Sequence, residues 1–159
     1  MNILVSHPTG NANLRAAIAG LDAADSLKEF HTSLATNPDS PWVKLLPFSI
    51  RKELLRRTFP VNQSKIHAHP FKEIGRLVLP RMGIQELTEH EVGRFSVDAV
   101  YHSLDKHVAK RLAMLGADKL NAVYAYEDGA QSTFEIARKL GIHALYDLPI
   151  GYWRAAQKL

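Results

Sequence analysis

Hydrophobic and polar residues are arranged along the chain in blocks that predict strands and helices in turn. The apolar run at residues 3–5 is typical of a strand that is buried on both faces of a parallel sheet. A polar turn at residues 7–11 follows, and apolar residues then recur at helical spacing at Leu14, Ala17, Ile18 and Leu21. The first 25 residues therefore predict a strand, a glycine-containing turn and a helix.

The same alternation continues through the rest of the chain. Further strands are predicted at residues 27–35, 65–69, 122–126 and 142–148, and helices at residues 47–59, 71–82, 95–115 and 130–140. In the second strand, Phe30, Thr32 and Leu34 are expected on one side.

Capping residues support the helix boundaries. Ser96 is a suitable N-cap for the long helix, and Gly116 and Gly141 are suitable ends for the last two helices. Pro80 should limit the helix at residues 71–82, because proline lacks a backbone N–H.

Strands that alternate with helices, joined by connections long enough for crossovers, define the expected fold class. The sequence predicts an α/β protein with a Rossmann-like parallel sheet and helices on both faces, in three α/β/α layers. With 159 residues, 46% of them hydrophobic, the chain is long enough for one such domain, at residues 1–159.

Composition limits the cellular compartment in which this domain is expected. The absence of cysteine excludes disulfides and thiolate chemistry and fits a reducing cytoplasm. The N-terminus lacks the basic region and apolar stretch of a signal peptide, and no apolar run reaches transmembrane length. We therefore expect a soluble, cytoplasmic protein.

The net charge of +4 is unevenly distributed. Eight basic residues lie between Arg51 and Arg81, against only Glu53 and Glu73. Such a segment is either a solvated face or a contact surface for anionic lipid, nucleic acid or phosphorylated substrate. The composition of the helix from Pro47 resembles that of an interfacial helix, which would place the protein at the inner membrane face. A surface helix with snorkelling arginines explains this composition equally. Nucleic acid is not the partner we expect.

Candidate chemistry lies where three predicted strands end. In an open parallel sheet, ligands bind beyond the carboxyl ends of the strands, near the point where strand order reverses. The first of these ends carries a histidine and a glycine turn, the second two carboxylates, and the third a tyrosine and a carboxylate: His7, Gly10, Asn11; Glu127, Asp128; Tyr146, Asp147. Carboxylates, amides and aromatic rings suit a polyhydroxylated ligand such as a sugar.

Several of these residues also have a structural interpretation. Asp128 is placed to cap the helix that begins at residue 130, and Asp147 to close a turn before Pro149. His7 can be a satisfied loop histidine, and the turn around Gly10 a simple β–α connection. Glu127 has no such role by position, which favours a function for it.

Metal and nucleotide motifs are weak or absent. His67 and His69 share one face of a strand, and Asp98, His102 and Asp105 share one face of a helix. Neither set has a matching third cluster in the sequence or H-E-x-x-H spacing, so no metal is expected. The sequence contains no G-x-G-x-x-G, P-loop or G-x-S-x-G motif.

Three segments, NILVSHPTGNAN, AVYAYEDGA and LYDLPIGYW, resemble the N-terminal halves of bacterial family-4 glycosyltransferases. The resemblance implies the GT-B architecture, in which two Rossmann-like domains face each other across a cleft. This chain would be the N-terminal, acceptor-side domain, without the C-terminal donor domain. The complete enzyme would transfer a sugar from a nucleotide-sugar to a hydroxyl of a glycan or lipid-linked acceptor, with retention of configuration and without metal or cofactor.

The same resemblance assigns roles to the loop residues. Glu127 and Asp147 become the candidate catalytic residues. The remaining loop residues become candidates for substrate binding: His7, Gly10, Asn11, Asp128 and Tyr146. The chain departs from the family at three positions where histidines are common: Tyr124, Tyr126 and Tyr146. If the family's function at the position of Tyr146 needs an imidazole, this chain cannot provide it. The phenol of Tyr146 can still hydrogen-bond to a sugar hydroxyl.

Two other functional classes stay open at this point. One is a non-catalytic Rossmann-like module that binds a ligand or partner at the same edge. The other is a basic protein that binds a membrane surface through the segment between Arg51 and Arg81. In the family, the C-terminal domain holds most of the nucleotide-sugar, so the chain alone is expected to transfer little or nothing.

Overall fold

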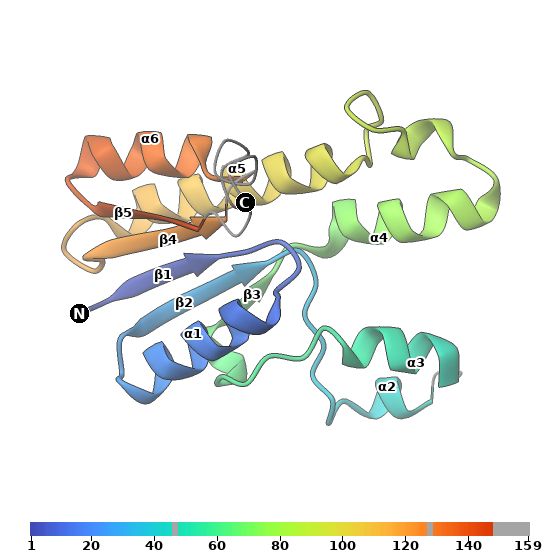
Figure 1. The fold of residues 1–159 in the computed structure, drawn as a ribbon, viewed down its shortest axis with the longest axis horizontal. Helices are drawn as coiled ribbons and strands as arrows, with labels where there is room; N and C mark the ends of the chain where they lie inside the picture. Colours follow the sequence, from blue (N-terminus) through green and yellow to red (C-terminus); the bar gives the residue numbers. More distant parts are fainter. Residues whose placement is uncertain (46–47, 127–128, 148–159) are drawn as a thin grey trace, which may run out of the picture.

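The computed structural model describes residues 1–45, 48–126 and 129–147. Its centre is a sheet of five parallel strands in the order β3–β2–β1–β4–β5. The strands are β1 (Ile3–Ser6), β2 (Leu27–Thr32), β3 (Ile66–Ala68), β4 (Ala122–Tyr126) and β5 (His143–Asp147). Helices flank both faces, which confirms the predicted Rossmann-like α/β/α fold (Figure 1).

The helices are of two kinds. The α-helices are α1 (Ala12–Ala23), α2 (Pro41–Lys44), α3 (Phe48–Leu55), α4 (Pro70–Val78), α5 (Val97–Leu115) and α6 (Gln131–Leu140). Short 3₁₀ turns are η1 (Gln63–Lys65), η2 (Leu79–Met82) and η3 (Glu86–Thr88). Helix α1 covers one face of the sheet and α5 and α6 the other, while α2, α3 and α4 lie beyond the carboxyl ends of the strands (Figure 1).

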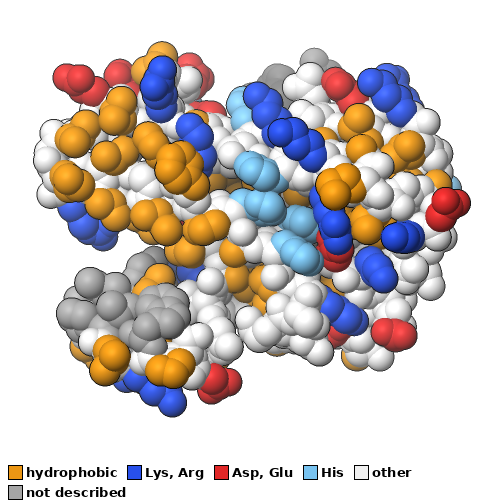
Figure 2. Space-filling view, turned by 180° about the vertical axis from the view of Figure 1, so that it is seen from behind, with side chains coloured by type: hydrophobic (Ala, Val, Ile, Leu, Met, Phe, Trp, Pro, Cys, Tyr) orange, Lys and Arg blue, Asp and Glu red, His pale blue; other side chains and the backbone are white. Residues whose placement is uncertain are grey.

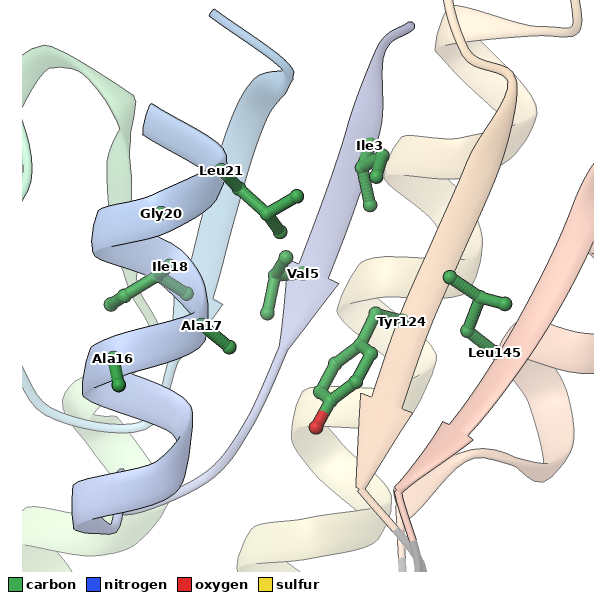
Figure 3. A pocket seen from close by; sticks show the side chains of 9 residues that line it. All are labelled: Ile3, Val5, Ala16, Ala17, Ile18, Gly20, Leu21, Tyr124 and Leu145. Atoms are coloured by element: carbon green, nitrogen blue, oxygen red, sulfur yellow. The ribbon is translucent and has the colours of Figure 1, made fainter. Parts of the chain in front are cut away.

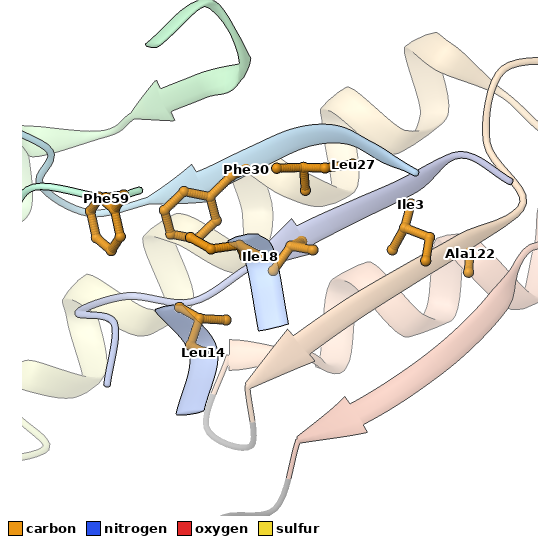
Figure 4. Close-up of a cluster of buried hydrophobic side chains, with 8 residues drawn as sticks. Ile3, Leu14, Ile18, Leu27, Phe30, Phe59 and Ala122 are labelled. Atoms are coloured by element: carbon orange, nitrogen blue, oxygen red, sulfur yellow. The ribbon is translucent and has the colours of Figure 1, made fainter. Parts of the chain in front are cut away.

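The alternating side chains of β1 divide the core into two clusters. Ile3 and Val5 face α1, where they pack with Leu14, Ile18, Leu27, Phe30, Phe59 and Ala122 (Figure 4). Leu4 faces the other way and packs with residues of α5 and α6, among them Leu104, Val108, Leu112 and Ala137. Both faces of β1 are therefore buried, as its continuous apolar run predicts.

Strand order reverses between β1 and β4. The chain runs outward from β1 through β2 to β3, and then crosses the sheet through α5 to place β4 on the other side of β1. The loops after β1 and β4 consequently diverge to opposite faces, which leaves a space for ligands outside the carboxyl ends of these two strands.

Local signals placed the long helix correctly. Helix α5 begins after Ser96, whose side chain accepts the backbone N–H of Ala99, and ends before Gly116. Helix α6 ends before Gly141, which has a left-handed conformation. These caps satisfy terminal backbone groups through nearby residues, so they can be recognised without knowledge of the fold.

Other predicted boundaries were wrong. Strand β2 ends at Thr32 and does not reach Leu34, because the backbone N–H of Ser33 donates to the carbonyl of Pro8 instead of continuing the ladder. Helix α4 ends at Val78, two residues before Pro80, and tightens into η2. The helix predicted at residues 47–59 is found as the shorter α3, which ends at Leu55, and α2 precedes it as a helix that was not predicted; Pro47 lies outside the described residues.

Gly10 turns the chain from β1 into α1 and provides a test of this packing. Its φ is +74°, and a Cβ atom there would lie 2.5 Å from the Phe59 ring. We expect Gly10→Ala to lower the free energy of unfolding by about 2–3 kcal/mol, from left-handed strain and overpacking together. Gly83 is the matched control, since its φ is +81° and its Cβ would meet nothing within 4 Å.

Gly83→Ala should therefore show the conformational cost alone, about 1 kcal/mol. Urea unfolding of both variants measures the difference. Equal losses would mean that the Phe59 contact does not restrict the turn.

Among the described helices, none combines the length and the apolar character needed to cross a bilayer.

Candidate functional site

The candidate site lies at the carboxyl ends of β1, β4 and β5. The rings of His7, directly after β1, and Tyr126, at the end of β4, lie 4.3 Å apart between centroids. Asp147, the last residue of β5, is close enough to influence the pKa of His7. The structure thus brings His7 and Asp147 to one edge, although they are 140 positions apart in the sequence.

His7 is held by the turn that comes directly after it. Its side chain is buried, with 2% exposure, and its Nδ1 accepts the backbone N–H groups of Thr9 at 3.2 Å and Gly10 at 2.9 Å. Because Nδ1 accepts, the proton of the neutral ring is on Nε2. Nε2 is buried and has no hydrogen-bond partner among the described residues. Within the described part of the chain, the site therefore contains a fixed donor without an acceptor, an arrangement that is costly unless a ligand, solvent or another group completes it.

The protonation state of His7 is set by its surroundings. Burial lowers the pKa of His7 to about 4, and the carboxylate of Asp147 offsets only part of that effect. The ring is consequently neutral at physiological pH and donates through Nε2 without carrying a charge.

Asp147 also faces a tyrosine of β4. Burial, followed by hydrogen bonding to Asp147, raises the pKa of Tyr124, so its phenol stays protonated. Figure 3 shows the Tyr124 hydroxyl pointing toward the carboxyl end of β4. The Tyr124 hydroxyl thus donates to Asp147, and the Nε2–H of His7 together with the remaining lone pairs of Asp147 suits a hydroxyl group of a ligand.

The turn at Gly10 and Asn11 mainly fixes the backbone next to the candidate site. The Asn11 side chain accepts the backbone N–H of Leu14 at 2.8 Å and so caps α1, while Gly10 turns the chain next to His7. One acceptor of Asn11 is therefore used inside the protein. The backbone of the turn is pinned by its two hydrogen bonds to His7, which fixes the start of α1 relative to the histidine ring.

Not every predicted residue is found at this edge. Glu127 and Asp128 lie outside the described residues. Tyr146 alternates with Asp147 along β5 and packs against Phe134 of α6, with ring centroids 6.0 Å apart. Its side chain is therefore on the α6 face, separate from His7, and Tyr146 is 54% exposed.

Tyr101 also lies at this edge and was not predicted from the sequence. This residue of α5 places its ring 6.2 Å from that of Tyr126, almost perpendicular to it. Its position in the helical repeat is the same as that of neighbouring core residues, so no local signal distinguishes Tyr101 from a residue of the core. Only the crossover of α5 toward β4 makes it part of the edge.

An apolar groove of about 360 Å³ opens beside the site, on the face covered in part by α1 (Figure 3). Ala17 and Leu21 of α1 form one wall, and Tyr124 and Leu145 form the other. Among the described elements, no helix covers β4 and β5 on this face. Leu145 is accordingly exposed.

The acidic residues that share a face with His102 have structural partners. Asp105 accepts the backbone N–H groups of Ser132 and Thr133 at the start of α6. Asp98 accepts the backbone N–H of Glu91. Both carboxylates thus bind backbone groups of other segments, which accounts for their positions without a metal.

Several residues of the basic segment are also paired internally. Arg57 and Arg76 both contact Glu73, and Lys65 contacts Asp22 at 2.8 Å. The positive charge between Arg51 and Arg81 is therefore partly neutralised, and less of it is available to an anionic surface than the sequence suggests.

Comparison of the chain with protein-family models, with curated proteins and with solved structures found no match.

The low pKa of His7 predicts a pH-dependent stability. Between its ordinary pKa of 6.5 and the native value of about 4, the unfolded chain binds a proton that the folded protein excludes. The contribution is complete above pH 6.5 and is lost as the pH falls toward 4. We expect His7 to account for about 2 kcal/mol of lost stability between pH 7.5 and pH 5.

Urea unfolding at the two pH values should show a smaller loss for His7→Asn, whose amide oxygen can still accept from the turn, than for the wild type. The exposed His143 is the control, and His143→Asn should keep the wild-type dependence. An unchanged loss in His7→Asn would show that the histidine is not held neutral.

Proposed function

We propose that this chain is the acceptor-side, Rossmann-like domain of a GT-B glycosyltransferase. The complete enzyme would transfer a sugar from a nucleotide-sugar to a hydroxyl of a glycan or lipid-linked acceptor. Three observations support the proposal: the resemblance of the loop segments to family-4 enzymes, the parallel α/β/α fold, and the polar residues at the edge where strand order reverses.

The observation that carries the proposal is the buried Nε2–H of His7, for which the described residues provide no acceptor. A buried Nε2–H beside an aromatic ring and a carboxylate fits a sugar-like ligand, because one hydroxyl can accept from His7 and donate to Asp147. The Tyr126 ring would lie against the apolar side of the sugar. In this arrangement Asp147 orients the hydroxyl of the acceptor, and Glu127 stays the second catalytic candidate.

Binding of the nucleotide-sugar needs a second domain in this proposal. In GT-B enzymes the nucleotide-sugar is held mainly by the domain across the cleft, which a further segment or a partner chain would supply. The apolar groove between α1 and β5 supports a larger assembly, since such a surface is normally covered by another helix.

The test is sugar transfer by the complete polypeptide that contains this chain, measured as nucleoside diphosphate released from UDP- and GDP-sugars in the presence of membrane extract. We expect His7→Asn to lower kcat/KM by about 10- to 100-fold, because a buried ligand oxygen then loses its donor while the turn keeps an acceptor. His143→Asn is the control and should be unaffected.

Three results would contradict the proposal. Equal activity of His7→Asn and the control would remove His7 from the site. A folded complete polypeptide without release from any nucleotide-sugar would favour the non-catalytic module. Binding to anionic vesicles that persists at moderate salt, again without release, would favour a basic protein of the membrane surface.

A further inference from the structure

A group of histidines with one glutamate lies on the α5 face, at the β3 edge of the sheet. We call it the histidine cluster; its members are Glu29, His31, His67, His69 and His107. Ring centroids of neighbouring histidines are 4.6–5.4 Å apart. Figure 2 shows histidine side chains gathered in the middle of this face, with Lys and Arg side chains around them.

Strand register creates the cluster. An irregularity between Ile3 and Leu4 places Glu29 opposite Leu4, so that Glu29 and His31 both point to the α5 face. Parallel pairing then sets His67 beside His31, and His69 comes two residues later on the same side. The pair at residues 67 and 69 had no partner in the sequence, and the sheet supplies two.

The donor atoms of three members are close enough to share one ion. Nε2 of His31 lies 3.0 Å from Oε2 of Glu29, and Nε2 of His67 lies 3.9 Å from the same oxygen. One ligand atom from each of the three residues lies within 4.8 Å of the others. Ligands of a tetrahedral zinc ion, at about 2.0–2.1 Å from the metal, are about 3.3 Å apart. The 39% exposed side chain of His67 can supply the small adjustment that remains.

We propose that Glu29, His31 and His67 form a binding site for a divalent transition metal of the zinc type. Two imidazoles and one carboxylate are ligands that zinc accepts, whereas calcium and magnesium prefer oxygen alone. Three protein ligands leave the fourth position to water or to another ligand. The site goes beyond the proposed sugar transfer, for which we expect no metal.

A hydrogen-bond partner that would orient the His31 ligand is already in place. Nδ1 of His31 lies 3.1 Å from Nε2 of His69. Without metal, Nε2 of His31 donates to Glu29, and Nδ1 of His31 accepts a hydrogen bond from Nε2 of His69. When Nε2 binds metal, the His31 proton is on Nδ1 and donates to His69. A ligating histidine characteristically donates its other N–H in this way.

Arg111 fixes the carboxylate in the same manner. Its Nη2 donates to Oε1 of Glu29 at 2.6 Å and its Nε to Oε2 at 3.0 Å. Burial alone would raise the pKa of Glu29, but hydrogen bonds from His31 and Arg111 outweigh it and lower the pKa to about 2. Arg111 thus orients the carboxylate, and Oε2 has a lone pair for an ion once Nε2 of His31 binds the metal and no longer donates to this oxygen.

A metal here would join β2 to the edge strand β3 and, through Arg111, to α5. It would also be connected to the candidate sugar site, because the backbone N–H of His7 donates to the carbonyl of His31 at 3.0 Å. Binding should consequently raise the thermal stability of the fold.

The test uses the full chain without a histidine tag and two probes, Zn²⁺ and Co²⁺. With Zn²⁺ at about 100 times its dissociation constant, Tm should rise by about 5–10 °C. Co²⁺ should give the intense visible absorption of a four-coordinate ion. His67→Gln should lose both responses, with affinity lowered by about 100-fold or more, since one of three ligands is removed.

The matched control is His143→Gln, which changes an exposed histidine on the opposite edge strand, β5, and should keep both responses. His67 is chosen because it is the most exposed of the three ligands, and circular dichroism of the variant checks that it folds. Absence of a Tm rise and of the cobalt spectrum in the wild type would overturn the proposal. Equal metal affinity of His67→Gln and wild type would also overturn it.

Discussion

Replacing Asp105 by alanine is expected to lower the free energy of unfolding by about 3–4 kcal/mol. The side chain is buried, with 3% exposure, and its two oxygens accept the backbone N–H groups of Ser132 at 2.7 Å and Thr133 at 2.9 Å. These donors belong to the first turn of α6, whose own N-cap residue, Ala130, makes no side-chain hydrogen bond. The variant would leave both donors unpaired and remove a negative charge from the N-terminus of the helix.

Asp98→Ala is the control on the same helix. Asp98 accepts one backbone N–H, that of Glu91 at 3.0 Å, near the surface, so its loss should cost less than about 1 kcal/mol. Asp105→Asn should fall between the two, because its amide oxygen can accept only one of the two bonds well. Urea unfolding gives all three values. Similar losses for Asp98→Ala and Asp105→Ala would show that α6 does not depend on this cap.

Glu73→Ala is expected to be at least as severe, with a loss of about 3–5 kcal/mol. Glu73 of α4 is 1% exposed and accepts two hydrogen bonds from Arg76, both at 2.8 Å, and one from Arg57 at 3.2 Å. Removal of the carboxylate leaves two guanidinium groups without their partner, one of them largely buried. It also disconnects α4 from the segment directly after α3.

The comparison is Glu135→Ala on α6, where the exposed carboxylate accepts a hydrogen bond from Gln131 at 3.4 Å. This change should alter stability by less than about 0.5 kcal/mol. A second variant, Glu73→Gln, keeps the shape of the side chain and should still be strongly destabilised, because it removes the charge that the two arginines share. A mild effect of Glu73→Gln would mean that packing, and not the ion pair, holds α4.

Much of the fold could be predicted from local patterns. The apolar run of β1, the helical stripe of α5 with Ser96 before it and Gly116 after it, and the alternation of strands with helices all led to the correct class. Boundaries failed where a distant group competed for the backbone. The Ser33 N–H, which donates to Pro8, is the clearest case, because no residue near Ser33 indicates it.

The candidate site was predictable only in part. The topological rule brought His7 and Asp147 to one edge, since the carboxyl ends of parallel strands meet there. It did not separate Tyr146 from that edge, because the face to which a strand residue points depends on register. The sequence also could not show that Nε2 of His7 carries the proton, because this depends on two hydrogen bonds that Nδ1 accepts within the folded turn.

The sequence by itself determined which segments become strands and helices, because spacing, caps and turn residues act over a few positions. The tertiary structure alone decided which side chains become neighbours. Asp105 meets the start of α6, and Glu29 and His31 meet His67, through strand order, register and crossover. Those features are fixed by the burial of two apolar faces around one sheet, a property of the whole chain that no short segment encodes.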